Sequence, residues 1–377
     1  MGIWRSTDPT TFDDVDGIII NESAPAPNVK GVATNIAILV GEFTAGPYEL
    51  TEVGSIGEML EIYQGGSGMT ALKNKKFGRL RVIRVQGTGN GGAVVDADYE
   101  AAIAKAGVEG AGNILFLDSY NTVRNGYLEQ HVAEAQDKIA ILCGPEVQTV
   151  SEAMTDVANY RDADGRLIYA YPWVQTIVDG QSVMTNPASW YASIISQTAP
   201  HIDPAYVANT RFLGGITGLK YALNRAHYIQ LKDAGVSAFE YDEDVGFKLK
   251  SGVTTQILNS SKVTVLRRRM ADFIANSVAK YLKNYQNAPN TLENRTSVKA
   301  AIQAWDQEQE NLGILPKDAE VKTGKAKIID TEALNTDDTI AQGLFKILYK
   351  RRIYSSMRYI VLQAEIGESV VVTEGEA

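Results

Sequence analysis

The sequence predicts a mixed α/β fold built from two or three packed units. Residues 113–172 alternate short apolar runs with amphipathic segments in the order strand, helix, strand, helix, strand, an order typical of parallel strands joined by right-handed crossovers. The last third of the chain shows two long helical patterns followed by short alternating strands. At roughly 150 residues per domain, 377 residues are enough for two or three cores.

The N-terminal segment, residues 1–24, lacks the apolar residues for a core of its own. Its one strand-like run is Val15–Ile20, and Pro25 and Pro27 end the segment. A lone apolar strand must pair with something. It either extends a sheet edge of this chain or is donated to a neighbouring chain.

Strand and helix patterns follow in the next part of the chain. Asn35–Gly41 predicts a buried strand and Gly57–Tyr63 a helix, which the following glycine cluster ends. Arg79–Val85 alternates arginine with aliphatic residues at a period close to two. This pattern predicts a strand with one buried face and one largely basic face.

The alternating region predicts three strands and two helices. The strands are expected at 113–117, 139–142 and 167–171, and the helices at 126–138 and 151–160. Strands joined by helices in this way pair in parallel, and we expect this α/β unit to extend to about residue 245.

The last third is expected to contain two helices and a hairpin. Apolar residues at steps of three and four predict a helix over Val263–Leu282. A second helix is predicted over Thr291–Asn311, with Asn290 as its N-terminal cap. Leu344–Ile353 alternates like a strand, and its hairpin partner is expected at Met357–Gln363.

The composition narrows the class of protein. Hydrophobic residues make up 45% of the chain, the share of an ordinary folded protein. The 36 basic and 45 acidic residues give a net charge of −9, which argues against nucleic acid as a partner because phosphates require a basic surface. Cys143 is the only cysteine, so no internal disulfide can form, and its apolar run predicts a core position. No apolar run approaches the ~20 residues of a membrane span, so we expect no membrane insertion.

Two loops are similar to ligand-binding motifs but are predicted to be turns. Gly87–Gly92 satisfies G-x-G-x-x-G after a strand, yet a dinucleotide loop needs a helix that opens on the third glycine, and Ala93–Asp96 is strand-like. Asp162–Gly165 is similar to part of a calcium loop, but Tyr160 and Tyr171 occupy positions that require carboxylate-type ligands. A turn is the simpler interpretation of each.

No catalytic constellation is recognisable. The three histidines, His131, His201 and His227, lack the spacing of metal ligands or of a catalytic base. No nucleophile elbow occurs, because Gly65–Met69 departs from the pattern at its last position. We therefore expect no catalytic residue, no cofactor and no metal site.

Two basic clusters remain. They are Arg267–Arg269 on a predicted helix and Lys350–Arg352 near a predicted hairpin tip. Each is either a solvated face or a contact to an acidic partner surface.

The order of these elements resembles the sheath proteins of contractile phage tails and related contractile injection systems, over nearly the whole chain. Gly31–Ala37 is similar to the family's G-V-x-T-x-I-A strand, and Arg81–Val85 before a glycine-rich turn to its V-x-R-V-x-G segment. The βαβ unit lies where the family has a subtilisin-like fold without protease residues. Val263–Asn290, with its arginine run, and the later Ala341–Gly343 are similar to the C-terminal domain of the family.

The resemblance implies a domain order. It implies an α/β protein with an α+β core domain, exchanged terminal strands and an inserted βαβ subtilisin-like domain that lacks protease residues. The expected segments are an N-terminal strand-exchange arm (1–24), the first part of the core domain (25–97), the outer α/β domain (98–245), the C-terminal part of the core domain (246–366) and a C-terminal exchanged strand (367–377).

The resemblance also implies a function. The chain would be a structural subunit and not an enzyme, which polymerises as stacked rings into a helical sheath around a tail tube. Contraction would drive the tube through the target cell envelope. The tail tube, baseplate and tail terminator proteins would be its partners, and it would assemble in the host bacterial cytoplasm as part of the virion tail.

Particular residues receive roles from the same resemblance. The exchanged strands would include Ile18, Ile19 and Ile20 at one end and Val370, Val371 and Val372 at the other. Candidates for facing an acidic tube are Arg267, Arg268, Arg269, Arg295 and Lys299.

Two other functions stay open at this point. One is an α/β enzyme, a hydrolase or a nucleotide-dependent protein, with a site at the ends of the strands in 113–172. The other is a different self-assembling shell protein. A phage tail, a bacteriocin and another injection system are not distinguished by the sequence.

Overall fold

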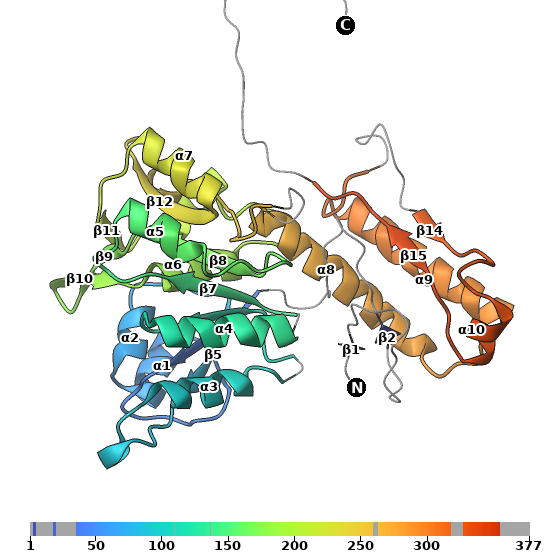
Figure 1. Ribbon diagram of the computed structural model, residues 1–377, viewed down its shortest axis with the longest axis horizontal. Coiled ribbons are helices and arrows are strands. Elements are labelled where there is room, and N and C mark those ends of the chain that lie inside the picture. The colour runs from blue at the N-terminus through green and yellow to red at the C-terminus, as the bar shows by residue number, and fades with distance from the viewer. Residues whose placement is uncertain are drawn as a thin grey trace, which may run out of the picture.

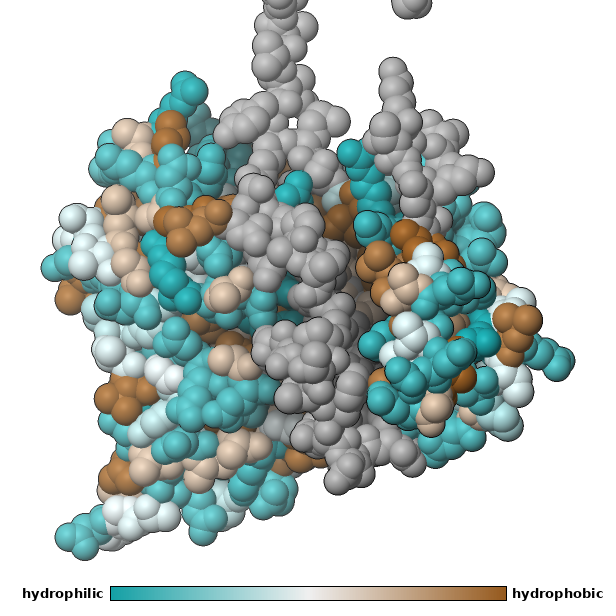
Figure 2. Space-filling model, turned by 45° about the vertical axis from the view of Figure 1, so that its right-hand side comes forward, coloured by the Kyte–Doolittle hydropathy of each residue, from teal (hydrophilic) through white to brown (hydrophobic). Residues whose placement is uncertain are grey.

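The computed structural model describes residues 3–4, 18–19, 35–108, 110–135, 137–258, 263–317 and 327–354. Most of them belong to two units (Figure 1). The sheet unit, residues 36–249, is a large sheet with helices on both faces, and the C-terminal unit, residues 265–353, is built on two long helices. The described surface seen in Figure 2 is largely hydrophilic, with hydrophobic residues in small groups.

The sheet unit contains an eight-stranded sheet in the order β13-β12-β8-β7-β6-β3-β5-β4. Its strands are β3 (Ile36–Gly41), β4 (Thr51–Val53), β5 (Arg79–Arg84), β6 (Ile114–Leu117), β7 (Ile139–Cys143), β8 (Leu167–Tyr171), β12 (Val236–Asp242) and β13 (Gly246–Leu249). The six central strands are parallel, while the edge strands β4 and β13 run antiparallel to their neighbours. Strands β3, β6, β7 and β8 are buried along their whole length, as their continuous apolar sequences require in a sheet covered on both faces.

Helices cover the two faces of this sheet. One face packs on α3 (Asp96–Lys105), α4 (Thr122–Ala135), α5 (Val150–Val157) and α7 (Arg225–Ala234). The other face packs on α1 (Ile56–Tyr63), α2 (Ser67–Leu72), α6 (Pro187–Gln197) and the 3-10 helix η2 (Val207–Leu213). A small antiparallel sheet lies on this second side, with strands β9 (Val174–Val178), β10 (Gln181–Thr185) and β11 (Ile216–Leu219) in the order β10-β9-β11.

The C-terminal unit has a core of its own. Its elements are α8 (Val265–Leu282), η3 (Lys283–Tyr285), α9 (Leu292–Asn311), β14 (Lys327–Ile329), α10 (Asp337–Ala341) and β15 (Leu348–Lys350). The apolar stripe of α8 packs on Val298, Ile302 and Trp305 of α9, and the short sheet β14–β15 contributes Ile328 and Tyr349. In Figure 1, α8 lies between the sheet unit and the layer of α9, β14 and β15.

Near the N-terminus the structure describes two short strands. They are β1 (Ile3–Trp4) and β2 (Ile18–Ile19), which pair in parallel. Of the expected exchange residues, Ile18 and Ile19 are therefore in β2. Ile20 and the run Val370–Val372 lie outside the described residues.

The predicted strand and helix positions of the α/β region are confirmed. The strands and helices expected between 113 and 171 appear as β6, α4, β7, α5 and β8, in parallel pairing. The predicted strands at 35–41 and 79–85 and the helix at 263–282 are confirmed as β3, β5 and α8. Helix α2 was not predicted, because the glycine cluster before it suggested a long turn.

One expectation, the cap of α9, needs correction. The expected domain boundary at 97 and 98 stays a prediction; the strands before and after it, β5 and β6, both pair with β3 in one sheet. The cap of α9 is Thr291, whose hydroxyl accepts the Asn294 N–H, whereas Asn290 donates to the carbonyl oxygen of Leu344 at 3.1 Å. Strand β15 pairs with β14, and the expected hairpin partner 357–363 lies outside the described residues, so that pairing stays a prediction.

Candidate functional site

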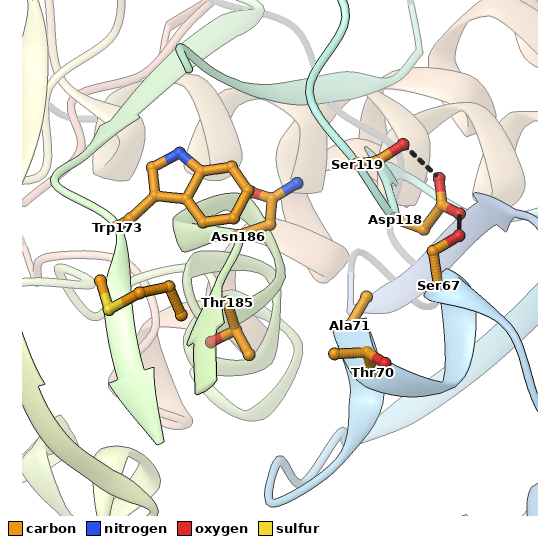
Figure 3. Close-up of a pocket in the computed structure, with 9 residues that line it drawn as sticks. Ser67, Thr70, Ala71, Asp118, Ser119, Trp173, Thr185 and Asn186 are labelled. Carbon is orange, nitrogen blue, oxygen red and sulfur yellow. Dashed lines mark hydrogen bonds between the residues drawn. The ribbon is translucent and has the colours of Figure 1, made fainter. Parts of the chain in front are cut away.

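The sheet has a topological switch point between β3 and β6. From β3 the chain crosses to β5 on one side, and from β5 it returns past β3 to β6 on the other side. The carboxyl ends of the strands at such a point form the usual ligand crevice of a doubly wound sheet. A cleft of about 220 Å³ lies at this edge (Figure 3). It is lined by Ser67, Thr70, Ala71, Asp118, Ser119, Trp173, Met184, Thr185 and Asn186.

Asp118 follows the last residue of β6 and has its hydrogen-bonding capacity filled by the chain itself. Its carboxylate accepts the Glu42 N–H at 2.9 Å, the Tyr99 hydroxyl at 2.8 Å and the Ser119 hydroxyl at 3.3 Å. It also accepts the Ser67 hydroxyl from the first turn of α2 (Figure 3). Four donors use all the strong acceptor positions of a carboxylate. Asp118 therefore ties β3, α2 and α3 to the end of β6.

The groups behind Asp118 are also paired. The Arg124 guanidinium lies 3.7 Å from the centroid of the Tyr99 ring and forms ion pairs with Asp96 at 2.8 Å and Glu42 at 3.5 Å. Burial, together with the negative Asp118, raises the pKa of Tyr99 far above its ordinary value, so its hydroxyl stays a donor at neutral pH. The network therefore has a structural role, since it holds neighbouring elements at the end of β6.

The cleft lacks the parts of a hydrolase site. Within the described lining, Ser67 donates directly to a carboxylate and none of the three histidines is present to act as base. Acyl transfer needs such a base oriented by an acid. The arrangement therefore gives no support to the enzyme alternative at these strand ends.

The glycine-rich loop is a turn held by the helix that follows it. Helix α3 begins at Asp96, earlier than the strand-like sequence suggested. The Asp98 carboxylate accepts the Thr88 hydroxyl at 2.6 Å, the Val95 N–H at 2.8 Å and the Thr88 N–H at 3.1 Å. These bonds, above all the one from the Thr88 hydroxyl, lower the pKa of Asp98. A carboxylate thus occupies the helix N-terminus where a bound phosphate would lie, and the interpretation as a turn is confirmed.

The second loop and the cysteine also have structural roles. The Asp162 carboxylate accepts the N–H groups of Asp164 and Arg166, forming a turn between α5 and β8 as predicted. Cys143 is buried in β7, and burial raises the pKa of its thiol well above the ordinary value. Within the described residues, no group of three or more His, Cys, Asp or Glu side chains could hold a metal ion.

The arginine run on α8 is largely internal, and the expectation of an exposed basic face is wrong for two of its three residues. Arg268 and Arg269 are each 1% exposed, while Arg267 is half-buried. Arg268 and Arg166 both bind the carboxylate of Asp272, with shortest distances of 2.7 and 3.0 Å. Because Arg166 precedes β8, this triad joins α8 to the sheet unit.

Arg269 serves as a cap for another helix. Its guanidinium donates to the carbonyl oxygens of Ile195 at 3.0 Å, Thr198 and Ala199 at the C-terminal end of α6. A cation at the carboxyl end of a helix satisfies free carbonyl groups and the helix dipole. Burial lowers the pKa of Arg269 to about 10, which still leaves it charged at neutral pH.

The remaining basic candidates are on α9 and β15. Arg295 and Lys299 are half-buried on α9, and Lys299 pairs with Asp330 at 2.8 Å. In the second cluster, Lys350–Arg352, the side chain of Arg351 is buried and forms ion pairs with Glu310 at 2.6 Å and Asp306 at 3.1 Å. Arg351 is therefore not part of a solvated face. Among the described helices, none has both the length and the apolar character to span a membrane.

Comparisons with known proteins identify the fold. No protein-family model and no curated protein matches the chain. A chain of the contracted helical sheath of the anti-feeding prophage (AFP) matches with a TM-score of 0.69 and 16% identity, over 96% of this chain and 99% of that chain.

Two further sheath structures agree. The contracted PVC sheath complex of an extracellular contractile injection system matches with a TM-score of 0.70 and 17% identity, over 94% of this chain and 98% of that chain. The sheath tail protein of Desulfitobacterium hafniense matches with a TM-score of 0.59 and 12% identity, over 83% and 93%. This chain therefore has the fold of contractile sheath proteins.

Proposed function

We propose that the protein is a structural subunit of a contractile sheath, which polymerises helically around a tail tube and contracts to drive the tube through a target cell envelope. The observation that carries this proposal is the extent of the match to the AFP sheath, which covers 96% of this chain and 99% of that one. If only part of the chain shared the fold, the rest could carry a different function. A match over nearly both whole chains supports the same role for the whole of the matched region.

Polymerisation is proposed to proceed by strand exchange through the two chain ends. The donated strands contain Ile18–Ile20 and Val370–Val372, each from a different neighbour. The sheet β14–β15 is the proposed acceptor, since it has only three paired residues in each described strand. A sheet of two short strands is marginal by itself, and its outer edges offer backbone groups to added strands.

Contraction is proposed to move each subunit as a stiff body that rotates about its linkers. The Arg166–Asp272–Arg268 triad and the Arg269 cap hold α8 firmly on the sheet unit. The linkers at 21–30 and 367–368, outside the described residues, would absorb the rotation. The extended array would be metastable, and release at the baseplate would let subunits repack with more buried surface.

The proposed partners are other copies of this chain, an inner tail tube, a baseplate and a tail terminator, without nucleic acid. Attachment to an acidic tube would be weak and electrostatic, so that contraction can break it. Because Arg268 and Arg269 are internal, this role now rests on Arg267, Arg295 and Lys299. Assembly in the bacterial cytoplasm and an outer domain of subtilisin-like type belong to the same proposal.

The proposal is tested by breaking the N-terminal strand. Ile19→Pro removes a backbone donor from the donated strand, whereas the control Ser23→Pro adds a proline to a linker that already contains two. We expect the Ser23→Pro protein to form striated hollow tubes by negative-stain electron microscopy, and the Ile19→Pro protein to stay folded by circular dichroism without forming tubes. Tubes from both variants would contradict strand donation, and no tubes from the unmodified chain would contradict the sheath itself.

A further inference from the structure

Lys75 is a buried lysine. It lies three residues after Leu72, the last residue of α2, and is 2% exposed. Its amine lies 4.3 Å from the centroid of the Trp190 ring and 3.4 Å from the carbonyl oxygen of Lys73. Among the residues that the structure describes, no carboxylate pairs with it. A charged ammonium at this position would have one weak acceptor for its three donors.

The elements packed around Lys75 carry little charge. Helix α2 and strand β9 have no ionisable side chain, and α6 contributes only the buried phenol of Tyr191. Charged groups on the adjoining segments are Lys73 and Lys76, close to Lys75 in the chain, and Asp179 at the turn after β9, which is paired with Lys73. Burial alone lowers the pKa of Lys75 from 10.5 to about 7.

The region is too tightly packed to hydrate a charge without moving. A Cβ atom at Gly215 would lie 2.8 Å from the carbonyl oxygen of Asn74 and 3.0 Å from the Trp190 ring. Asn74 also donates to the Thr176 hydroxyl of β9 at 3.0 Å, and Trp190 donates to Thr185 at the end of β10 at 2.9 Å. Movement at Lys75 therefore reaches α6 and both strands of the β9–β10 hairpin.

We propose that Lys75 is an acid-sensitive element of the sheet unit: uptake of a proton by its amine loosens the packing of α2 against α6 and the β9–β10 hairpin. The neutral amine fits the dry site beside Trp190. The ammonium requires water or acceptors that the closed packing does not supply, so the native chain has a closed form and, at lower pH, a loosened form. This inference does not depend on the proposed sheath function.

Hydrogen–deuterium exchange of the full-length chain tests the loosening. Exchange in peptides covering α2, β9 and α6 is compared at about pH 6 and about pH 8.5, after correction for the intrinsic pH dependence of exchange. We expect severalfold faster exchange at the lower pH, and no such difference in Lys75→Met, which replaces the amine with an apolar group. Lys76→Met, at an exposed neighbour, should keep the pH effect.

Two results would overturn the inference. One is an equal exchange rate at both pH values in the unmodified chain, and the other is the same acceleration in Lys75→Met. A direct titration keeps the test decisive if Lys75→Met does not fold. In ¹³C-lysine NMR of the unmodified chain, we expect one lysine signal with a midpoint near pH 7, and titration of every lysine near 10.5 would exclude the proposal.

Discussion

Replacing Asp272 by alanine should weaken the packing of α8 on the sheet unit. Asp272 is 4% exposed and accepts four hydrogen bonds, two from Arg166 and two from Arg268, at 2.7 to 3.2 Å. Without this carboxylate, two buried guanidinium groups lose their shared acidic partner, while Arg166 keeps its bond to the carbonyl oxygen of Lys138 and Arg268 its bond to that of Asp164, each at 3.3 Å.

The expected cost follows from the burial of these groups. Breaking a buried ion pair by removing one partner costs about 3–5 kcal/mol, because the charge left behind is not hydrated. At about 2 °C per kcal/mol for a large domain, Tm should fall by roughly 6 °C or more. Scanning calorimetry of the freshly purified, unpolymerised chain measures this fall. The matched control is Asp233→Ala, which removes an acid that is 64% exposed and should change stability by less than about 0.5 kcal/mol.

A rescue variant separates charge from shape. Replacing Arg166 and Arg268 by methionine together with Asp272→Leu removes all three charges and keeps similar volume, so most of the lost stability should return. A Tm change for Asp272→Ala as small as that for Asp233→Ala would refute the account of the triad as the joint between the two units.

Three further predictions concern other charged groups. In the unmodified chain, the free energy of unfolding should rise by about 1.4 kcal/mol per pH unit between about pH 7 and 10.5, because only the unfolded state keeps the Lys75 proton in that window. Lys75→Met should abolish this contribution, as measured by urea unfolding at several pH values. An unchanged slope in Lys75→Met would contradict the buried neutral amine. Arg351→Met removes the cation that pairs with Asp306 and Glu310 of α9 and should lower the free energy of unfolding by about 3–5 kcal/mol, as measured with urea. Lys350→Met, at an exposed neighbour, should lower it by less than about 0.5 kcal/mol. Equal effects would exclude the internal ion pairs. Arg295→Glu with Lys299→Glu should reduce co-sedimentation with purified tail tubes severalfold and leave self-polymerisation intact, and equal loss of both would contradict tube attachment.

The local structure of this chain could be predicted from its sequence, whereas the order of strands could not. Runs such as Ile139–Cys143 are apolar throughout and are flanked by helical patterns, so they predict buried parallel strands. That β3 lies between β5 and β6 depends on contacts between residues far apart in the chain, as in the pairing of Ala37 with both Leu80 and Ile114. For that reason the sequence alone does not show which strands share one sheet.

The arginine run shows where a local interpretation of charge fails. Arg267–Arg269 suggested a solvated face, since buried arginine is rare without a partner. The partner was present in the sequence at the next turn of the helix, as Asp272 lies four residues after Arg268. The second arginine on that carboxylate, Arg166, comes from the sheet unit and is visible only in the fold.

The switch-point network was missed for a related reason. Glu42 and Asp118 each follow a buried strand directly, and acids in that position of parallel strands meet at one sheet edge. Their meeting requires β3 and β6 to be neighbours, which the sequence does not reveal. Ser67 and Tyr99, which complete the network, come from helices with no distinguishing pattern.

A helical reconstruction by cryo-electron microscopy of tubes grown from the full-length chain is the most direct test of the proposed assembly. The account predicts hollow tubes in which residues 18–20 of one copy and 370–372 of another lie as added strands beside β14 and β15 of a third. Closed shells, or tubes in which both ends of every copy pair only within that same copy, would contradict it.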